Sequence, residues 1–182
     1  MFIQTEQTPN PATLKFVPGR AVMQSGTANF VAAAAADRSP LAQHLFTLEG
    51  VTGVYLGADF ITVSKDEAHD WYALKPTVLG AIMEHFTAGR PVMAEGTAPV
   101  AATNEDDDEL VTQIKELLET RVRPAVAQDG GDIIFDHYQD GVVYLHMQGS
   151  CAGCPSSTAT LKAGIENMLR HYVPEVQEVR AV

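Results

Sequence analysis

Two cysteines near the C-terminus, Cys151 and Cys154, are the side chains in this sequence whose types and spacing could do chemistry. They are the only cysteines among the 182 residues, and they lie in the run GSCAGCPSST at residues 149–158. Two thiols separated by two residues can turn both sulfurs toward one point, as a shared zinc ion, an iron-sulfur cluster or a redox disulfide requires. The spacing alone does not choose among these three chemistries.

The residues beside the cysteines favour an anionic metal-thiolate centre. Ala152 and Gly153 place almost no side chain between the sulfurs, so a bulky inorganic group could approach the backbone closely. Pro155 predicts the start of a helix, with Cys154 at or near its cap, because proline suits the first helical position. The free N–H groups of that first turn are expected to stabilise thiolate over thiol.

The cysteine pair could also be two buried apolar residues or a redox disulfide, and a metal centre needs more ligands than this pair supplies. Two small buried apolar residues would not need a glycine-flanked turn. A thioredoxin-like disulfide usually has an aromatic residue before the first cysteine and often a proline between the two, whereas Ser150, Ala152 and Gly153 stand here. Zinc or a cluster normally takes four protein ligands, so either histidines or a second chain must complete the set. His137, His146 and His171 each fit a structural role, and we assign none of them as a ligand.

Longer runs of sequence carry a resemblance to a known family. GSCAGCPSSTATLK at residues 149–162 and RPAVAQDGGDI at residues 123–133 resemble the C-terminal domain of NifU-like (Nfu-type) iron-sulfur cluster carriers. MFIQTEQTPNPATLKFVPG at residues 1–19, SPLAQHLF at 39–46 and DFITVSK at 59–65 resemble the N-terminal domain that accompanies this module. Nearly the whole chain is covered, apart from a linker.

The resemblance implies a carrier of iron-sulfur clusters and not an enzyme. Cys151 and Cys154 would ligate the cluster together with the same pair of a second chain, giving a homodimer when loaded. A 4Fe-4S cluster is favoured over 2Fe-2S. The donor would be an upstream assembly scaffold and the recipients apo iron-sulfur proteins. The competing hypotheses are a thiol-disulfide oxidoreductase and a zinc-stabilised interaction module.

Composition limits the partners and the compartment. Twelve basic and 23 acidic residues give a net charge of −11, which repels nucleic acid phosphates and anionic membranes. We therefore expect no nucleic acid and no membrane partner. The sequence has no apolar run of membrane-spanning length, and its start has no basic signal and no Arg-rich transit segment. We expect a cytoplasmic bacterial protein.

The hydrophobic pattern predicts an α+β protein of two small domains. Residues 1–90 form a ββαββα domain, with strands at 2–5 and 13–17, a helix from Pro40 closed by Gly50, strands at 51–56 and 60–65, and a helix from Pro76 to Gly89. Residues 18–38 are expected to be mostly irregular. Trp71 and Tyr72 are interpreted as core residues, because aromatic residues leading into an amphipathic helix are more often core than a docking patch.

A polar, acidic stretch at residues 91–109 predicts a flexible linker before the second domain. Residues 110–182 predict an αββα(β) order typical of NifU-like domains. Its elements are a helix that Pro124 kinks or ends, strands at 133–138 and 142–148 joined by Asp140 and Gly141, a helix ended by Pro174, and an edge strand at 176–182. The Asp-Gly-Gly-Asp run at 129–132 is interpreted as a turn whose glycines free the backbone.

Overall fold

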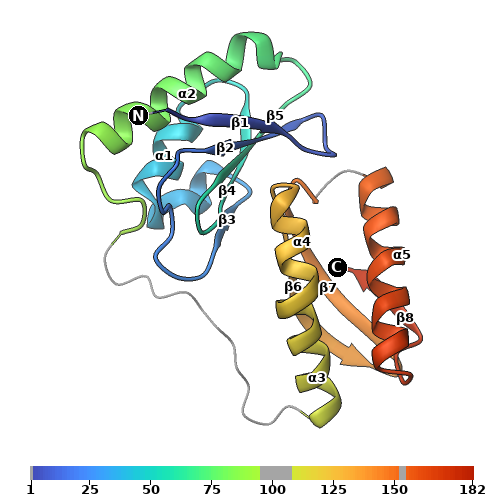
Figure 1. The fold of residues 1–182 in the computed structure, drawn as a ribbon. Helices are drawn as coiled ribbons and strands as arrows, with labels where there is room; N and C mark the ends of the chain where they lie inside the picture. The colour runs from blue at the N-terminus through green and yellow to red at the C-terminus, as the bar shows by residue number, and fades with distance from the viewer. Residues whose placement is uncertain (1, 95–107, 152–154) are drawn as a thin grey trace. The chain divides into compact units, whose positions relative to one another are not determined.

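The chain folds into two compact units, divided between residues 101 and 102. A computed structural model describes residues 2–94, 108–151 and 155–182, with backbone alone at 155–157. Both units combine helices with a β-sheet, which confirms the α+β prediction (Figure 1). Among the described residues, none of the helices has the length and apolar character needed to cross a membrane.

The N-terminal unit is an antiparallel five-stranded sheet with helices packed on it. The strand order is β1-β2-β5-β4-β3. The elements are β1 Gln4–Gln7, β2 Thr13–Val17, β3 Ala28–Phe30, the 3-10 helix η1 Ala33–Arg38, α1 Pro40–Phe46, β4 Val51–Leu56, β5 Ile61–Lys65 and α2 Trp71–Thr87. The helix α1 begins as predicted, because the Ser39 hydroxyl accepts a hydrogen bond from the Ala42 N–H (3.1 Å) and Pro40 occupies the first turn.

Three local predictions for this unit are wrong. The segment 18–38 contains the short strand β3, which pairs with β4. The helix α2 begins at Trp71 and not at Pro76, because the Asp70 carboxylate caps it by accepting from the Tyr72 N–H (3.1 Å). Tyr72 is not a core residue, since its side chain is 91% exposed. Trp71 does pack against the core, and its indole N–H donates to the Pro11 carbonyl (3.1 Å).

Residues 91–94, which we call the exit segment, are bonded to the N-terminal unit. The Ser39 hydroxyl donates to the Val92 carbonyl (2.6 Å), and the Ala94 N–H donates to the Arg38 carbonyl (2.8 Å). Burial lowers the pKa of His85. Its Nε2 donates to the Pro91 carbonyl (3.0 Å), because a carbonyl oxygen can only accept. The first residues of the expected linker therefore belong structurally to the domain that precedes them.

The C-terminal unit is a three-stranded sheet in the order β6-β7-β8. Its elements are α3 Glu109–Leu117, a π-helical turn Leu118–Val122, α4 Arg123–Gln128, β6 Gly131–Gln139, β7 Val142–Gly149, α5 Pro155–Tyr172 and β8 Glu178–Ala181. The strands β6 and β7 form the predicted hairpin, with positive φ at both Asp140 (50°) and Gly141 (80°). The predicted edge strand is β8, which runs parallel to β7.

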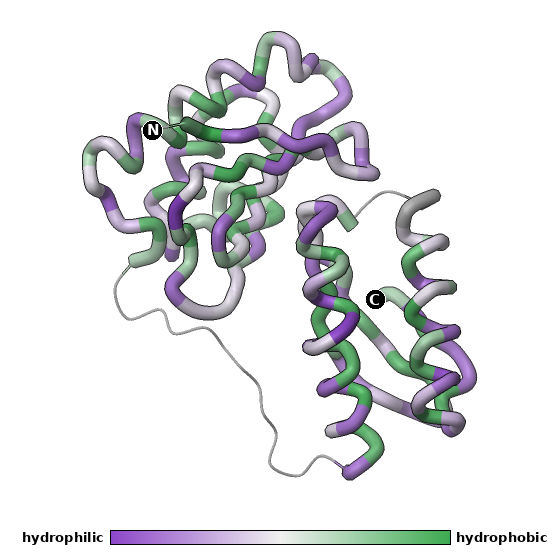
Figure 2. Tube along the Cα trace, viewed as in Figure 1, coloured by the Kyte–Doolittle hydropathy of each residue, from purple (hydrophilic) through white to green (hydrophobic). Residues whose placement is uncertain are grey.

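The helices of this unit lie across one face of its sheet (Figure 1). Pro124 does not end the first helix, because it lies in the first turn after the π-helical turn, where a missing N–H is tolerated. Figure 2 shows apolar and polar segments alternating along the helices of both units. The apolar core beneath the helices includes Ile114, Leu118, Val122, Val126, Ile133, Val143, Leu145, Cys151, Ile165, Leu169 and Val179.

Candidate functional site

The first cysteine of the predicted pair lies between the end of β7 and the start of α5. The strand β7 ends at Gly149, and Ser150 and Cys151 follow it directly. The helix α5 begins at Pro155, which confirms the predicted helix start. Cys154, together with Ala152 and Gly153, lies outside the described residues. The structure therefore defines one half of the predicted site.

The sulfur of Cys151 lies directly against the backbone of Gly131 at the beginning of β6. A Cβ atom added to Gly131 would come well under 3.0 Å from Cys151 Sγ, and 3.1 Å from both the Cys151 nitrogen and the Gln148 carbonyl oxygen. Gly131 pairs with Gly149 across the hairpin, so two glycines face each other beside the sulfur. Each glycine of the Asp-Gly-Gly-Asp run is thus required for a different reason. Gly130 has a φ of 77°, as the turn prediction requires, and Gly131 leaves room for the thiol.

Hydrogen bonds fix the backbone on both sides of Cys151. The Ser150 N–H donates to the Gly130 carbonyl (3.2 Å), and the buried Ser150 hydroxyl donates to the Asp129 carbonyl. On the other side, the Thr158 hydroxyl in the first turns of α5 donates to the Cys151 carbonyl (3.0 Å). The turn is therefore bonded to the end of α4 and to the start of α5 at once.

Cys151 is a buried thiol. Its side chain is 7% exposed and belongs to the apolar core of the unit. Burial raises the pKa of Cys151 to about 11, and the nearby carboxylates of Asp129 and Asp132 act in the same direction. At Cys151, burial therefore favours the thiol over the thiolate. A metal that binds this sulfur must displace its proton.

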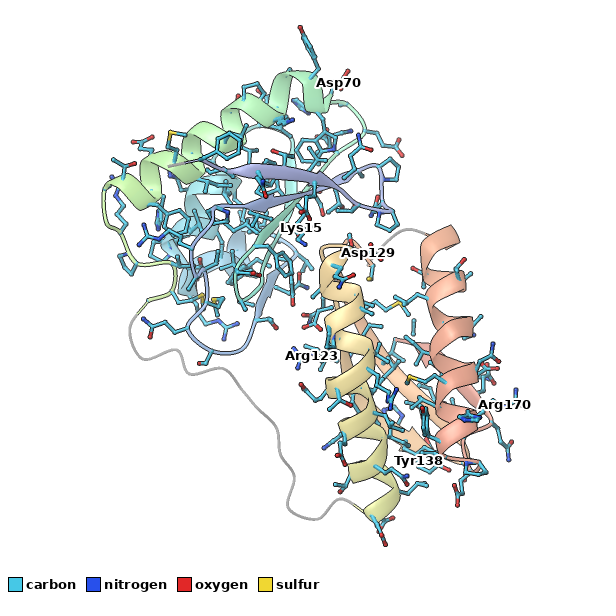
Figure 3. The ribbon with its side chains drawn as sticks, in the orientation of Figure 1. Lys15, Asp70, Arg123, Asp129, Tyr138 and Arg170 are labelled. Carbon is cyan, nitrogen blue, oxygen red and sulfur yellow. The ribbon has the colours of Figure 1, made fainter. Side chains whose placement is uncertain are left out.

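An ion pair holds the strand segment that carries Gly131. Figure 3 labels Arg123 on the first helix of this unit. Arg123 Nε and Nη2 donate to the two carboxylate oxygens of Asp132, each at 2.8 Å, and Nη1 donates to Glu119. Asp132 is 3% exposed, and its Oδ1 also accepts from the Ile133 N–H (2.8 Å). The hydrogen bonds from Arg123 to Asp132 and to Glu119, that to Asp132 above all, raise the pKa of Arg123. The guanidinium is thus a permanent cation beside the site.

The histidines considered as extra ligands form other contacts. His137 Nδ1 and His146 Nε2 both bond the Asp136 carboxylate on the exposed part of β6, and His137 stacks on Tyr144 with ring centroids 4.1 Å apart. No group of three or more His, Cys, Asp or Glu side chains within the described parts of the chain could hold a metal ion. We therefore assign neither His137 nor His146 as a ligand.

Sequence reasoning missed the residues that position the thiol. Ser150, Thr158, Arg123 and the contact of Gly131 with the sulfur emerge only from the fold. All four residues, and the partners Asp129 and Gly130 of Ser150, lie inside the two runs that carry the family resemblance, and this is the signal that could have marked them. The arrangement gives the thiol of Cys151 little conformational freedom, because its sulfur packs directly against the backbone of Gly131, where no side chain intervenes.

The C-terminal unit is a small α+β domain with a buried cysteine after its second strand, the N-terminal unit is a second α+β domain, and comparisons with known proteins place the chain in a family. The family described as "Scaffold protein Nfu/NifU N terminal" matches residues 3–89, and the "NifU-like domain" matches residues 114–180. The human protein "NFU1 iron-sulfur cluster scaffold homolog, mitochondrial" is 54% identical over 183 residues, which cover all of this chain and 72% of that protein. The chain belongs to the Nfu family.

A further relative and a solved structure are also similar to the chain. The protein of the same description from Drosophila ananassae is 54% identical over all of this chain and 64% of its own length. A solution NMR structure of a NifU-like protein from Saccharomyces cerevisiae is 26% identical over 52% of this chain and 86% of that chain, with a TM-score of 0.47. The family is one of scaffold proteins, and the chain is not an enzyme, as predicted.

One prediction is contradicted by these relatives. The expected location was the cytoplasm of a bacterium, but the human and Drosophila relatives, at 54% identity, are described as mitochondrial. The prediction failed because it was drawn from the composition of the first residues, which says little about a chain that spans only part of its relatives.

Proposed function

We propose that this chain carries an iron-sulfur cluster and delivers it to apo iron-sulfur proteins. Cys151 and Cys154 ligate the cluster, which is 4Fe-4S and is shared between two copies of the chain. An upstream assembly scaffold donates it. The description of the relatives as iron-sulfur cluster scaffolds supports the carrier role, and the domain order of this chain supports the same role through the family.

The observation that carries the proposal is the fixed position of Cys151 Sγ against Gly131, at the turn that leads to Cys154. A cluster needs four ligands, and one chain has two cysteines. Two copies related by a twofold axis would supply four thiolates from one self-complementary surface. Because each copy holds the cluster through two sulfurs, a thiolate of the recipient can replace these ligands one at a time.

The buried thiol also argues against the competing redox function. A dithiol oxidoreductase needs a nucleophilic cysteine with a lowered pKa and an accessible sulfur. Cys151 has the opposite properties, since burial raises its pKa to about 11 and leaves the side chain 7% exposed. Metal ligation does not need a low pKa, because the metal itself displaces the proton.

Anaerobic reconstitution with iron and sulfide tests the proposal. The wild-type chain should take up one cluster per two chains, measured by absorbance, iron, zinc and labile sulfide. Light scattering should find a dimer when loaded and a monomer after iron is removed. Cys151→Ala and Cys154→Ser should lose the cluster, whereas Gly164→Ala, a change into open space in α5, should retain it.

Three results would each contradict a specific part. A stoichiometric cluster in either cysteine variant would remove the ligand assignment. A loaded monomer in buffer free of small thiols would remove the shared cluster. Zinc without labile sulfide in the purified chain would favour the zinc-stabilised module.

A further inference from the structure

We propose that Arg123 and Asp132 form a positioning pair that holds Cys151 in the geometry needed for cluster binding. The inference rests on the proposed function. Neither residue is assigned as a ligand. The pair acts through the backbone of Gly131, against which the sulfur packs.

The first step of the argument is that the pair is rigid. Both carboxylate oxygens of Asp132 accept from the guanidinium at 2.8 Å, in the two-pronged arrangement that fixes orientation as well as distance. The third prong of the guanidinium reaches Glu119 on the preceding turn of the same helix, so the cation is also fixed from its own side. Asp132 is 3% exposed, and a charge buried to that extent requires its partner.

The second step is the connection from the pair to the sulfur. Asp132 follows Gly131 in the chain, and its Oδ1 also accepts from the Ile133 N–H (2.8 Å), so the first residues of β6 cannot move without breaking these bonds. The Gly130 carbonyl accepts from the Ser150 N–H (3.2 Å). The segment from Gly130 to Asp132 is therefore held by Arg123 on one side and supports Ser150 and Cys151 on the other.

The third step is that this position requires arginine and not only a positive charge. Arg123 is the first residue of α4, between the π-helical turn Leu118–Val122 and Pro124. A lysine at this position would keep the charge but not the fork, because an ammonium cannot occupy both carboxylate oxygens in one plane. The geometry, and not only the charge, is therefore the property to test.

The experiment compares Arg123→Lys and Arg123→Gln with Val179→Ala in the full-length chain. Val179 is fully buried in β8, beside the part of β7 remote from Cys151, so its truncation lowers stability without touching the site. Two quantities are measured: the rate at which a reconstituted cluster is lost to an iron chelator, and the rate at which iodoacetamide alkylates Cys151 in the apo chain, in a Cys154→Ser background. Thermal unfolding gives the stability of each variant.

We expect Arg123→Lys to increase the rates of cluster loss and of Cys151 alkylation at least fivefold, and Arg123→Gln to increase both rates further. Val179→Ala should leave both rates within twofold of wild type, although it lowers stability as much or more. Rates that follow stability alone across the three variants would overturn the inference. If the wild-type chain binds no cluster, the proposed function fails, and the alkylation rates still decide whether the pair positions the thiol. If Arg123→Gln does not fold, Arg123→Lys decides.

Discussion

Replacing Gly131 with alanine is the sharpest perturbation that the structure suggests. The added methyl group would lie well inside the contact distance of Cys151 Sγ, and 3.1 Å from two backbone atoms of the β7 end. Cβ atoms in real structures essentially never lie within 3.0 Å of such a neighbour, so the sulfur or the strand must move. Because Cys151 is buried among the core side chains, the sulfur has little free space to enter.

The expected cost follows from the cost of overpacking a core, about 1–3 kcal/mol. In a unit of this size each kcal/mol lowers the melting temperature by about 4–8 °C, so the C-terminal unit should melt roughly 5–20 °C earlier. The thiol should also become more accessible to alkylation, because the sulfur is displaced from its place against β6. Cluster loading should fall with it.

Thermal unfolding of the full-length chain provides the assay, with the transition of the N-terminal unit as an internal reference. The matched control is Gly164→Ala, also in the C-terminal unit, where the added Cβ meets no atom within 4 Å. This change should stabilise the unit by about 0.5–1 kcal/mol, because alanine is the better helix former. The two glycine-to-alanine changes should therefore shift the same transition in opposite directions.

A double-mutant cycle identifies the clash. In a Cys151→Ala background the sulfur is absent, so Gly131→Ala should cost distinctly less, with a coupling of about 1 kcal/mol or more. A residual cost should remain from the two backbone contacts at 3.1 Å. Unchanged stability of Gly131→Ala, or an equal cost with and without the sulfur, would refute the assignment of Gly131 as the support of the thiol.

Three further predictions concern other parts of the chain. Alkylation of Cys151 in the apo Cys154→Ser variant should become about tenfold faster per pH unit from 7 to 10, without a plateau, because the thiolate is the nucleophile and the pKa of Cys151 is about 11. The folded unit should also lose stability as the pH rises above about 9. The reason is that the thiol of the unfolded chain, with its ordinary pKa, releases its proton at a lower pH than the buried thiol does. Ser39→Ala should lower the unfolding free energy of the N-terminal unit by about 1–3 kcal/mol in urea titrations, since it removes a helix cap and leaves the Val92 carbonyl without this donor, while the C-terminal transition stays in place. Deleting residues 1–94, which removes the exit segment with its domain, should leave cluster content unchanged and slow cluster transfer to at least some recipients. The reason is that a tethered domain raises the effective concentration of what it binds. Equal transfer rates for every recipient would exclude such a docking role.

Local sequence signals predicted most of this fold because they act within a few residues. Ser39 with Pro40, Pro155, and Asp140 with Gly141 each fix a helix start or a turn through their own backbone preferences, and the structure has each where it was predicted. Tyr72 shows the limit of this reasoning. Its place at the start of an amphipathic helix suggested burial, but the cap at Asp70 sets the helix phase and turns Tyr72 to solvent.

The features that failed to emerge from the sequence depend on contacts between distant segments. The three residues of β3 are a strand only because β4 pairs with them. The burial of Cys151 depends on Gly131 in the neighbouring strand, and the spacing of the cysteines says nothing about that contact. The bond between Arg123 and Asp132 spans a turn whose geometry is fixed by Gly130. Each of these features depends on a partner from another segment, which local sequence signals do not identify.

The buried side chains along the first helix of the C-terminal unit keep a strict spacing of four: Ile114, Leu118, Val122 and Val126. In an ideal α-helix, four residues exceed one turn by about 40°, so three such steps would carry the stripe about 120° around the axis and away from the sheet. The π-helical turn at Leu118–Val122 has more residues per turn, so four residues fall short of a full turn there and the stripe is rotated back.

The wide turn is thus a correction of helical phase that the spacing of the apolar residues demands. Deleting one residue within it, such as Thr120, would change the spacing of the apolar residues to four, three and four, which in an uninterrupted α-helix brings Val126 back to within about 20° of Ile114. The apolar stripe and the place of Arg123 beside Asp132 would then both be kept. The extra residue and the wide turn therefore compensate for each other, and a variant that restores the regular α-helix is expected to keep the fold of this unit.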